Sequence, residues 1–247
     1  FCGGVIEAVA DVAACVKPQA AFFEQYGAAG WRALAGVIAT AHAHDLLVIL
    51  DAKRGDIAST GRAYAAAAFG GAAGFTAPVS GLAADAVTAS PYLGDDSLGP
   101  AVDYCAAGKG VFVLTRTSNP GAALLQEKAA EGRPLYLHVA ELVAELGAAH
   151  VGTFGYSDVG AVAGATSPGS LRLVRAALPQ AFLLVPGYGA QGAGKDALEG
   201  IATGAAAGFV VNASRSIIYA WRQGMVDYRV AAAHAAETMR DDLTFAL

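Results

Sequence analysis

Asp51, Lys53 and Asp56 place two carboxylates and one ammonium within a stretch of six residues. The stretch follows the apolar run Leu46–Leu50, whose length and composition indicate a buried strand. Residues i and i+2 of a strand face the same side, so Asp51 and Lys53 are expected to point together. Asp56 follows Gly55, from which it could turn back towards Lys53 or reach across to another subunit.

The alternation of charge determines which chemistry Lys53 is suited for. A lysine held between carboxylates keeps its ammonium form, because nearby negative charge favours the protonated state. Such a lysine is suited to donating a proton, whereas Schiff-base chemistry needs a neutral amine. A purely structural salt bridge is the alternative, and the position of the cluster at a strand end favours the functional interpretation.

Two segments further along the chain have the composition of a phosphate site. Pro186–Gly192 contains three glycines, whose backbone can approach an anion closely, and Ser214–Ser216 adds a guanidinium and two hydroxyls where a helix is expected to begin. Barrel enzymes often bind phosphate with the loops that follow their last two strands. The pairing of the two segments therefore predicts a phosphate-binding site.

Other kinds of catalytic site find little support in the sequence. No Ser-His-Asp or Cys-His arrangement, P-loop or metal-ligand cluster is evident, so no metal is expected. Three cysteines are too few and too scattered for a zinc site or a disulfide framework, and we interpret them as free thiols in a reducing cytoplasm. The five histidines fall mostly in helix-like segments, away from the strand ends: His42, His44, His138, His150 and His234.

The elements that must position these residues form a repeating pattern of strand and helix. The predicted strands share short and continuously apolar interiors: Ala14–Lys17, Leu46–Asp51, Ala86–Ala89, Gly110–Thr115, Val159–Gly164, Ala181–Val185 and Gly208–Val211. Such interiors are typical of parallel strands covered on both faces. The order favours a (β/α) barrel over an open doubly wound sheet, and the polar residues that follow every strand would meet at its mouth.

Helices are expected between these strands. The helix-like segments share amphipathic, alanine-rich composition: Cys2–Val12, Trp31–His44, Ser59–Phe69, Leu98–Ala107, Leu135–Leu146, Pro168–Leu178, Asp196–Thr203 and about Val226–Leu243. Ser118–Pro134 is longer than a usual βα connection, and long loops at this end of a barrel commonly form lids.

At 247 residues the chain is long enough for one large α/β barrel or for two small domains, and we expect a single barrel domain over residues 1–247. No run reaches the ~18 apolar residues that a membrane helix needs, although the hydrophobic fraction is 55% and the mean hydropathy +0.45. The net charge of −5 gives no basic field for nucleic acid, but a local cluster of donors can still bind a small anion. A start at Phe1 is not natural, and an eighth strand before it would complete the barrel.

The motifs together resemble the orotidine 5′-phosphate decarboxylase family. Asp51–Ile57 is similar to its D-x-K-x-x-D-I signature, of which D-x-K-x-x-D is shared with 3-keto-gulonate phosphate decarboxylases and hexulose phosphate synthases. Further segments resemble the bacterial subgroup of the decarboxylase, in the same order along the chain: Lys17–Gln19 with Phe22–Glu24, Pro91–Gly94, Thr117–Gly121, Pro186–Gly192 and Asn212–Ser216.

The resemblance implies a role for each of these residues. Lys17, Asp51, Lys53 and Asp56 would form an alternating charged network, with Asp56 donated by the second subunit of a homodimer. Lys53 would protonate C6 of the pyrimidine, and Asp51 would lie beside the departing carboxylate. The remaining implied contacts are to the substrate: Ile57 and Thr60 across the interface, with Thr60 at the ribose, Ser118 and Pro186 at the pyrimidine, and Gln191 and Arg215 at the phosphate.

The expected reaction converts orotidine 5′-phosphate into uridine 5′-phosphate and CO₂ in pyrimidine biosynthesis, in the cytoplasm and without a cofactor. An aspartate that binds the ribose hydroxyls in the family's first strand has no counterpart, since the chain starts after it. Two alternatives stay open: a Mg²⁺-dependent sugar-phosphate relative, and a barrel that binds nucleotide phosphates without turnover.

Overall fold

The computed structural model describes residues 1–74, 76–189, 192–202, 208–224 and 227–244. A parallel sheet of seven strands forms its centre, in the order β1-β2-β3-β4-β7-β8-β9. These strands are β1 (Cys15–Val16), β2 (Leu47–Arg54), β3 (Ala86–Ala89), β4 (Gly110–Arg116), β7 (Ser157–Ala163), β8 (Ala181–Val185) and β9 (Phe209–Val211). The prediction of a parallel α/β sheet is confirmed.

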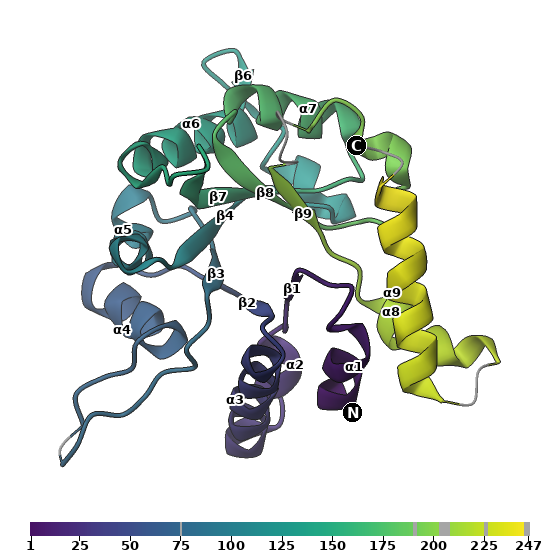
Figure 1. Ribbon diagram of the computed structural model, residues 1–247. Coiled ribbons are helices and arrows are strands. Elements are labelled where there is room, and N and C mark those ends of the chain that lie inside the picture. The colour runs from purple at the N-terminus through teal and green to yellow at the C-terminus, as the bar shows by residue number, and fades with distance from the viewer. Residues whose placement is uncertain (75, 190–191, 203–207, 225–226, 245–247) are drawn as a thin grey trace.

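Helices lie on the outer side of the curled sheet (Figure 1). They are α1 (Cys2–Val9), α2 (Ala21–Glu24), α3 (Gly27–Ala43), α4 (Ala58–Ala68), α5 (Gly99–Val102), α6 (Leu135–Gly147), α7 (Pro168–Ala177), α8 (Arg215–Ile218) and α9 (Tyr228–Thr244). Short 3₁₀ turns complete the connections: Asp95–Ser97, Asp103–Ala107, Pro120–Leu124, Ala148–His150, Lys195–Leu198 and Ala220–Gln223.

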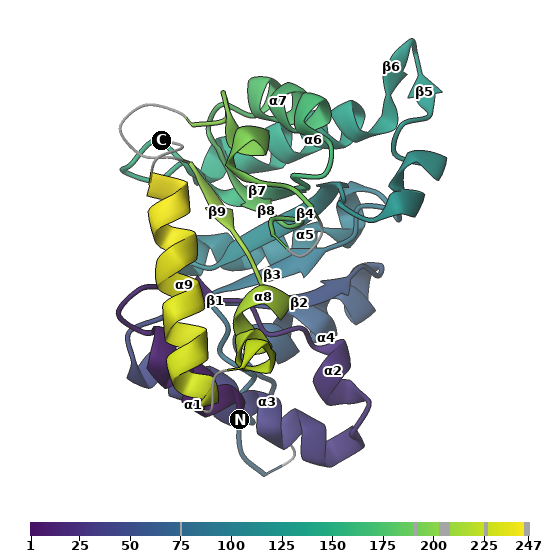
Figure 2. The ribbon, with the colours of Figure 1, turned by 90° about the vertical axis from the view of Figure 1, so that its right-hand side faces the viewer.

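The sheet curls into a barrel that is open on one side, between its two edge strands β1 and β9. In the part of the chain that the structure describes, no strand lies between these edges, and the eighth strand expected before Phe1 stays a prediction. The first and last helices pack on each other beside this opening (Figure 2), through a cluster formed by Val5, Val9, Ala232 and Ala236.

Buried side chains alternate between the two faces of the strands. Ile49, Ala86 and Phe112 belong to a small cluster inside the barrel. Their neighbours Leu50 and Val87 belong to the larger core between the sheet and the helices. Both faces are therefore apolar, which explains why the strands lack the alternation of polar and apolar residues that a half-exposed sheet shows.

The differences from the predicted elements are local. β2 extends three residues beyond the predicted end at Asp51, because Arg54 still pairs with Ala89 of β3 although its side chain is charged. Residues 98–107 form α5 followed by a 3₁₀ turn instead of one helix. The predicted helix at 196–203 is a 3₁₀ turn over Lys195–Leu198, and Thr203 lies outside the described residues.

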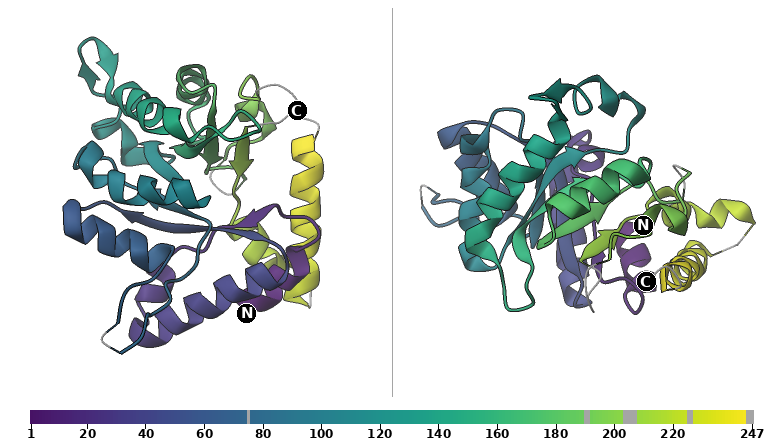
Figure 3. Two further views of the ribbon diagram at one scale, coloured as in Figure 1. Left: turned by 60° about the vertical axis from the view of Figure 1, so that its left-hand side comes forward. Right: turned by 90° about the horizontal axis from the view of Figure 1, so that it is seen from above.

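The long connection after β4 has its own structure. A 3₁₀ turn is followed by β5 (Ala129–Ala130) and β6 (Arg133–Pro134), which pair as a small antiparallel hairpin. Figure 3 shows this hairpin extending away from the barrel. The prediction that Ser118–Pro134 acts as a lid stays a prediction.

Candidate active site

The Asp51 carboxylate lies between two ammonium groups inside the barrel. Its Oδ2 accepts a hydrogen bond from Lys17 Nζ at 2.6 Å, and its Oδ1 accepts one from Lys53 Nζ at 2.5 Å. The Asp51 and Lys17 side chains are only 8% and 13% exposed, whereas Lys53 is 45% exposed. Lys53 is therefore the member of this network that is open to a ligand.

Backbone pairing between β1 and β2 brings Lys17 to Asp51. The amide of Asp51 donates to the carbonyl of Pro18 at 3.0 Å, and the amide of Ala20 donates to the carbonyl of Asp51 at 3.1 Å. The segment after β1 thus continues beside β2 and holds Lys17 next to the carboxylate. This pairing joins residues 34 positions apart in the chain.

Two opposing effects act on the ionisation of Asp51. Burial acts to raise the pKa of its carboxyl group, but the charges of Lys17 and Lys53 and the hydrogen bonds that they donate outweigh burial and lower the pKa below its ordinary value. The carboxylate is consequently ionised at neutral pH, as an ion pair with both lysines requires.

Lys53 occupies an irregular part of β2. Its φ of 50° lies in the left-handed region, which a residue with a side chain rarely adopts and which is frequent at functional sites. Leu50 pairs with Val87 and Arg54 with Ala89, so three residues of β2 face the single residue Thr88 of β3. The extra residues form a bulge in the strand that carries both Asp51 and Lys53.

Thr88 is a site residue that sequence reasoning did not find. Its side chain is buried, and its hydroxyl accepts a hydrogen bond from the Lys53 amide at 2.9 Å and donates one to Asp51 Oδ1 at 2.9 Å. The available signal was a hydroxyl in the otherwise apolar strand Ala86–Ala89, on the same side as the inward-facing Ala86.

Asp56 does not join this network within its own chain. It accepts a hydrogen bond from the amide of Ile57 at 2.8 Å, and it forms no ion pair with the other described residues. Ile57 is 56% exposed, and Thr60 in the first turn of α4 is exposed as well. Of the two directions open to Asp56, the turn back towards Lys53 is not the one observed.

Ser118 follows β4 and Pro186 follows β8, the two strands on either side of β7, at the same end of the barrel. The Ser118 carbonyl accepts a hydrogen bond from the Thr166 hydroxyl at 3.0 Å. A Cβ atom on Gly164 would lie 2.8 Å from Ser118 Cα, so only glycine permits this close approach. The Pro186 carbonyl accepts a hydrogen bond from the amide of Ala165 at 2.8 Å. The loops after β4, β7 and β8 are thereby joined.

The two segments with phosphate-site composition also meet. Gly187 and Gly189 have φ values of 102° and 67°, and a Cβ atom on Gly189 would lie 3.6 Å from the Ser216 hydroxyl oxygen. Arg215 begins α8, and its exposed side chain forms no ion pair with the described part of the chain. Gln191, the other residue expected at the phosphate, lies outside the described residues.

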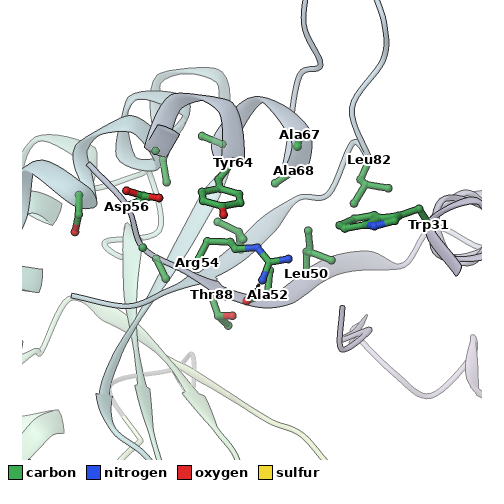
Figure 4. Close-up of a pocket in the computed structure, with 17 residues that line it drawn as sticks. Trp31, Leu50, Ala52, Arg54, Asp56, Tyr64, Ala67, Ala68, Leu82 and Thr88 are labelled. Atoms are coloured by element: carbon green, nitrogen blue, oxygen red, sulfur yellow. Dashed lines mark hydrogen bonds between the residues drawn. The ribbon is translucent and has the colours of Figure 1, made fainter. Parts of the chain in front are cut away.

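A mainly apolar pocket of about 180 Å³ lies on the other side of β2, between the sheet and α3, α4 and α5. Figure 4 shows Arg54 within it, beneath the ring of Tyr64 and in the direction of Trp31. The guanidinium of Arg54 also pairs with Glu24. Because Arg54 faces the helices and Asp51 the barrel interior, this pocket lies behind the charged network.

Within the described ranges, no three His, Cys, Asp or Glu side chains gather in a way that could hold a metal ion. None of the described helices is both long and apolar enough to cross a membrane.

Comparison with known proteins defines the class of this barrel. Residues 4–223 match the model of the orotidine 5′-phosphate decarboxylase / HUMPS family. The chain therefore belongs to this family.

Individual relatives carry the decarboxylase name. Orotidine 5′-phosphate decarboxylase of Rhodopirellula baltica is 48% identical over 233 residues, which cover 94% of this chain and 76% of the relative. The protein of the same name from Roseiflexus castenholzii is 42% identical over 252 residues, covering 100% of this chain and 84% of the relative. The structure of Leishmania donovani OMP decarboxylase matches with a TM-score of 0.80 and 38% identity, covering 99% of this chain and 86% of the other.

Proposed function

We propose that this chain decarboxylates orotidine 5′-phosphate to uridine 5′-phosphate and CO₂ in pyrimidine biosynthesis, with Lys53 as the proton donor and no cofactor. The single observation that carries the role of Lys53 is the Asp51 carboxylate held between the Lys17 and Lys53 ammonium groups. The names of the relatives support the choice of substrate.

The chemistry needs a fixed positive charge at one carbon atom. When the bond from C6 to the carboxylate breaks, its electron pair stays on C6 in the plane of the ring, where the π-system cannot delocalise it. An ammonium already held in place stabilises this pair without the reorganisation that water would require, and then transfers a proton to C6. Lys53 is suited to this role because it is both oriented by Asp51 and 45% exposed.

Asp51 contributes in two ways in this proposal. It orients Lys53 through the hydrogen bond that its Oδ1 accepts, and its negative charge lies on the side from which the substrate carboxylate leaves. Repulsion between the two carboxylates would raise the energy of the bound substrate. Lys17 neutralises the other oxygen of Asp51 from a nearly buried position.

In the same proposal, the contacts to the pyrimidine and to the phosphate lie across the mouth of the barrel. Ser118 and Pro186 contact the pyrimidine, and Arg215 and Gln191 hold the phosphate. The exposed guanidinium of Arg215 at the start of α8, beside the glycine loop, supports the assignment of the phosphate end. Binding energy from this remote group can order the loops, so it should affect the rate as well as affinity.

A homodimer with shared active sites completes the proposal. Asp56 has no ion-pair partner among the described residues of its own chain, and Ile57 is largely exposed, which suits residues that complete the site of a second subunit. The proposed protein is one barrel domain over residues 1–247 and acts in the cytoplasm on a nucleotide rather than on nucleic acid or a membrane.

Replacing Lys53 with Ala tests the proton donor. Lys53→Ala should lower kcat for orotidine 5′-phosphate by at least ~10³-fold, as expected for losing a preorganised donor to the transition state. Absorbance at the pyrimidine band follows the reaction, and binding of uridine 5′-phosphate reports whether the site is intact. Near-normal turnover would refute the assignment.

Lys109→Ala is a matched control for this experiment. Lys109 also pairs with an aspartate, Asp85, at 3.5 Å, but at the opposite end of the strands. Adding EDTA to the same assay separates the proposed enzyme from Mg²⁺-dependent sugar-phosphate relatives. The chelator should lower the activity of such a relative and leave the activity of a metal-independent decarboxylase unchanged. Absence of any turnover by the unaltered chain would favour a phosphate-binding barrel without catalysis.

A further inference from the structure

Because of the irregular part of β2, the Lys53 backbone lies outside the regular pairing of β2 with β3. Between Leu50 and Arg54, the partners of Val87 and Ala89, three residues have to be accommodated opposite one. Lys53 adopts a left-handed conformation there. Its amide cannot follow the hydrogen-bonding pattern of a parallel ladder, and it donates instead to the side chain of Thr88 at 2.9 Å.

The same hydroxyl also orients the carboxylate. Thr88 Oγ1 uses its own proton to reach Asp51 Oδ1 at 2.9 Å, and this oxygen is the one that accepts the hydrogen bond from Lys53 Nζ at 2.5 Å. One buried hydroxyl therefore links the main chain of the lysine to the carboxylate that holds its ammonium group.

We propose that Thr88 is a positioning residue for proton transfer, an inference that rests on the proposed function of Lys53. Its hydroxyl holds the bulge in the geometry that aims the Lys53 ammonium at the substrate, and it keeps Asp51 in the orientation that serves both lysines. Thr88 acts through these two residues. Thr88 is 35 residues from Lys53 and 37 residues from Asp51 in the sequence, and its side chain is buried. No local sequence motif can therefore indicate this role.

Two substitutions separate the hydroxyl from the shape of the side chain. Thr88→Val keeps the branched shape but leaves the Lys53 amide and Asp51 Oδ1 without this partner, and should lower kcat by about 10- to 100-fold, in line with losing hydrogen bonds to a charged site. KM for orotidine 5′-phosphate should change less than about threefold, because the proposed ground-state contacts of Ser118 and Arg215 remain. Thr88→Ser keeps the hydroxyl and should stay within about threefold of the unaltered kcat.

The pH profile gives a readout that a merely structural role would not move. The charged groups facing Asp51 are Lys17 after β1 and Lys53 on β2, and Thr88 is its neutral partner on β3. The thiol of Cys15, at the start of β1, interacts with Lys17. Loss of a hydrogen bond to the ionised carboxylate raises its pKa. The acid limb of kcat should therefore move to higher pH in Thr88→Val and stay in place in Thr88→Ser.

Thr115→Val is the matched control. Thr115 is as buried as Thr88, at 1% exposed, and lies on the neighbouring strand β4, but its hydroxyl donates to the carbonyl of Val113 and not to the charged network. This variant should keep the kcat and the pH profile of the unaltered protein. Melting temperatures of all variants show whether each is folded.

The outcomes distinguish this inference from the proposed function. If Lys53→Ala lowers turnover while Thr88→Val leaves kcat and its pH profile unchanged, the positioning role is overturned and the proton donor stands. Equal losses in Thr88→Val and Thr88→Ser would also overturn it, since packing rather than the hydroxyl would matter. If Lys53→Ala is active, the proposed function itself fails whatever Thr88 does.

Discussion

At the scale of residues, the charged network assigns different tasks to two similar lysines. Both contact Asp51 at similar distance, but Lys17 is 13% exposed and Lys53 45%. A nearly buried ammonium can neutralise Asp51 without reaching a ligand, whereas an exposed one can also touch the substrate. Exposure, and not residue type or distance, therefore separates the supporting lysine from the proposed proton donor.

Arg215 is the residue through which the phosphate assignment can be tested. Arg215→Ala should lower kcat/KM for orotidine 5′-phosphate by ~10²-fold, the scale of losing a charge-assisted hydrogen bond, and change it little for orotidine, which lacks the phosphate. Steady-state rates on the two substrates measure the difference. Equal losses on both would mean that Arg215 does not hold the phosphate.

At the scale of elements, the ends of β4, β7 and β8 behave as one joined surface. Thr166 donates to the Ser118 carbonyl, and Ala165 donates to the Pro186 carbonyl. The proposed pyrimidine contacts are thus held by one side-chain hydroxyl and one backbone amide of the segment after β7. A substitution in that segment should displace the Ser118 backbone although Ser118 itself is not substituted.

Gly164→Ala makes this expectation testable. The added Cβ atom would lie 2.8 Å from Ser118 Cα, a backbone atom that must shift. We expect about a tenfold loss of kcat/KM, the order seen when a substrate-positioning group is displaced by a fraction of an ångström. Gly36→Ala is the control: a Cβ atom on Gly36 meets nothing within 4 Å, and alanine there should stabilise α3 by up to about 1 kcal/mol.

Unchanged kcat/KM in Gly164→Ala would contradict the joined arrangement of these loops. Thermal unfolding of both variants shows whether a loss of activity reflects local displacement or loss of the fold.

At the scale of the whole molecule, the half-buried Asp56 and its exposed neighbours Ile57 and Thr60 lie apart from the charged network of their own chain. The barrel of one chain supplies Lys17, Asp51 and Lys53, and the start of α4 presents Ile57 and Thr60 outward. In the proposed homodimer, twofold symmetry would place each Asp56 at the partner's site.

Mixing two inactive variants tests the shared site. Lys53→Ala and Asp56→Ala should each be nearly inactive alone. After random reassociation, half of the dimers carry both substitutions on different chains, and one of their two sites is intact, which gives about a quarter of the unaltered activity. Absence of recovery, with subunit exchange verified by differently tagged chains, would show that Asp56 does not act across the interface.

The sequence by itself determined the order of the elements and the facing of Asp51 and Lys53. The order follows from a local rule, since continuous apolar runs indicate buried parallel strands. The bounds of β3 and β8 were predicted correctly for this reason. The expected common side of Asp51 and Lys53 is also observed, but the bulge and the left-handed φ of Lys53 depart from the regular strand that this expectation assumed.

Only the tertiary structure decided which distant groups complete the site. Lys17 and Thr88 reach Asp51 from the two neighbouring strands, through the register between β1, β2 and β3. Register depends on lateral packing between segments more than 30 residues apart, which no local periodicity encodes. The bulge at Lys53 arises from the same lateral pairing, so the conformation of the proposed proton donor is a property of the assembled sheet.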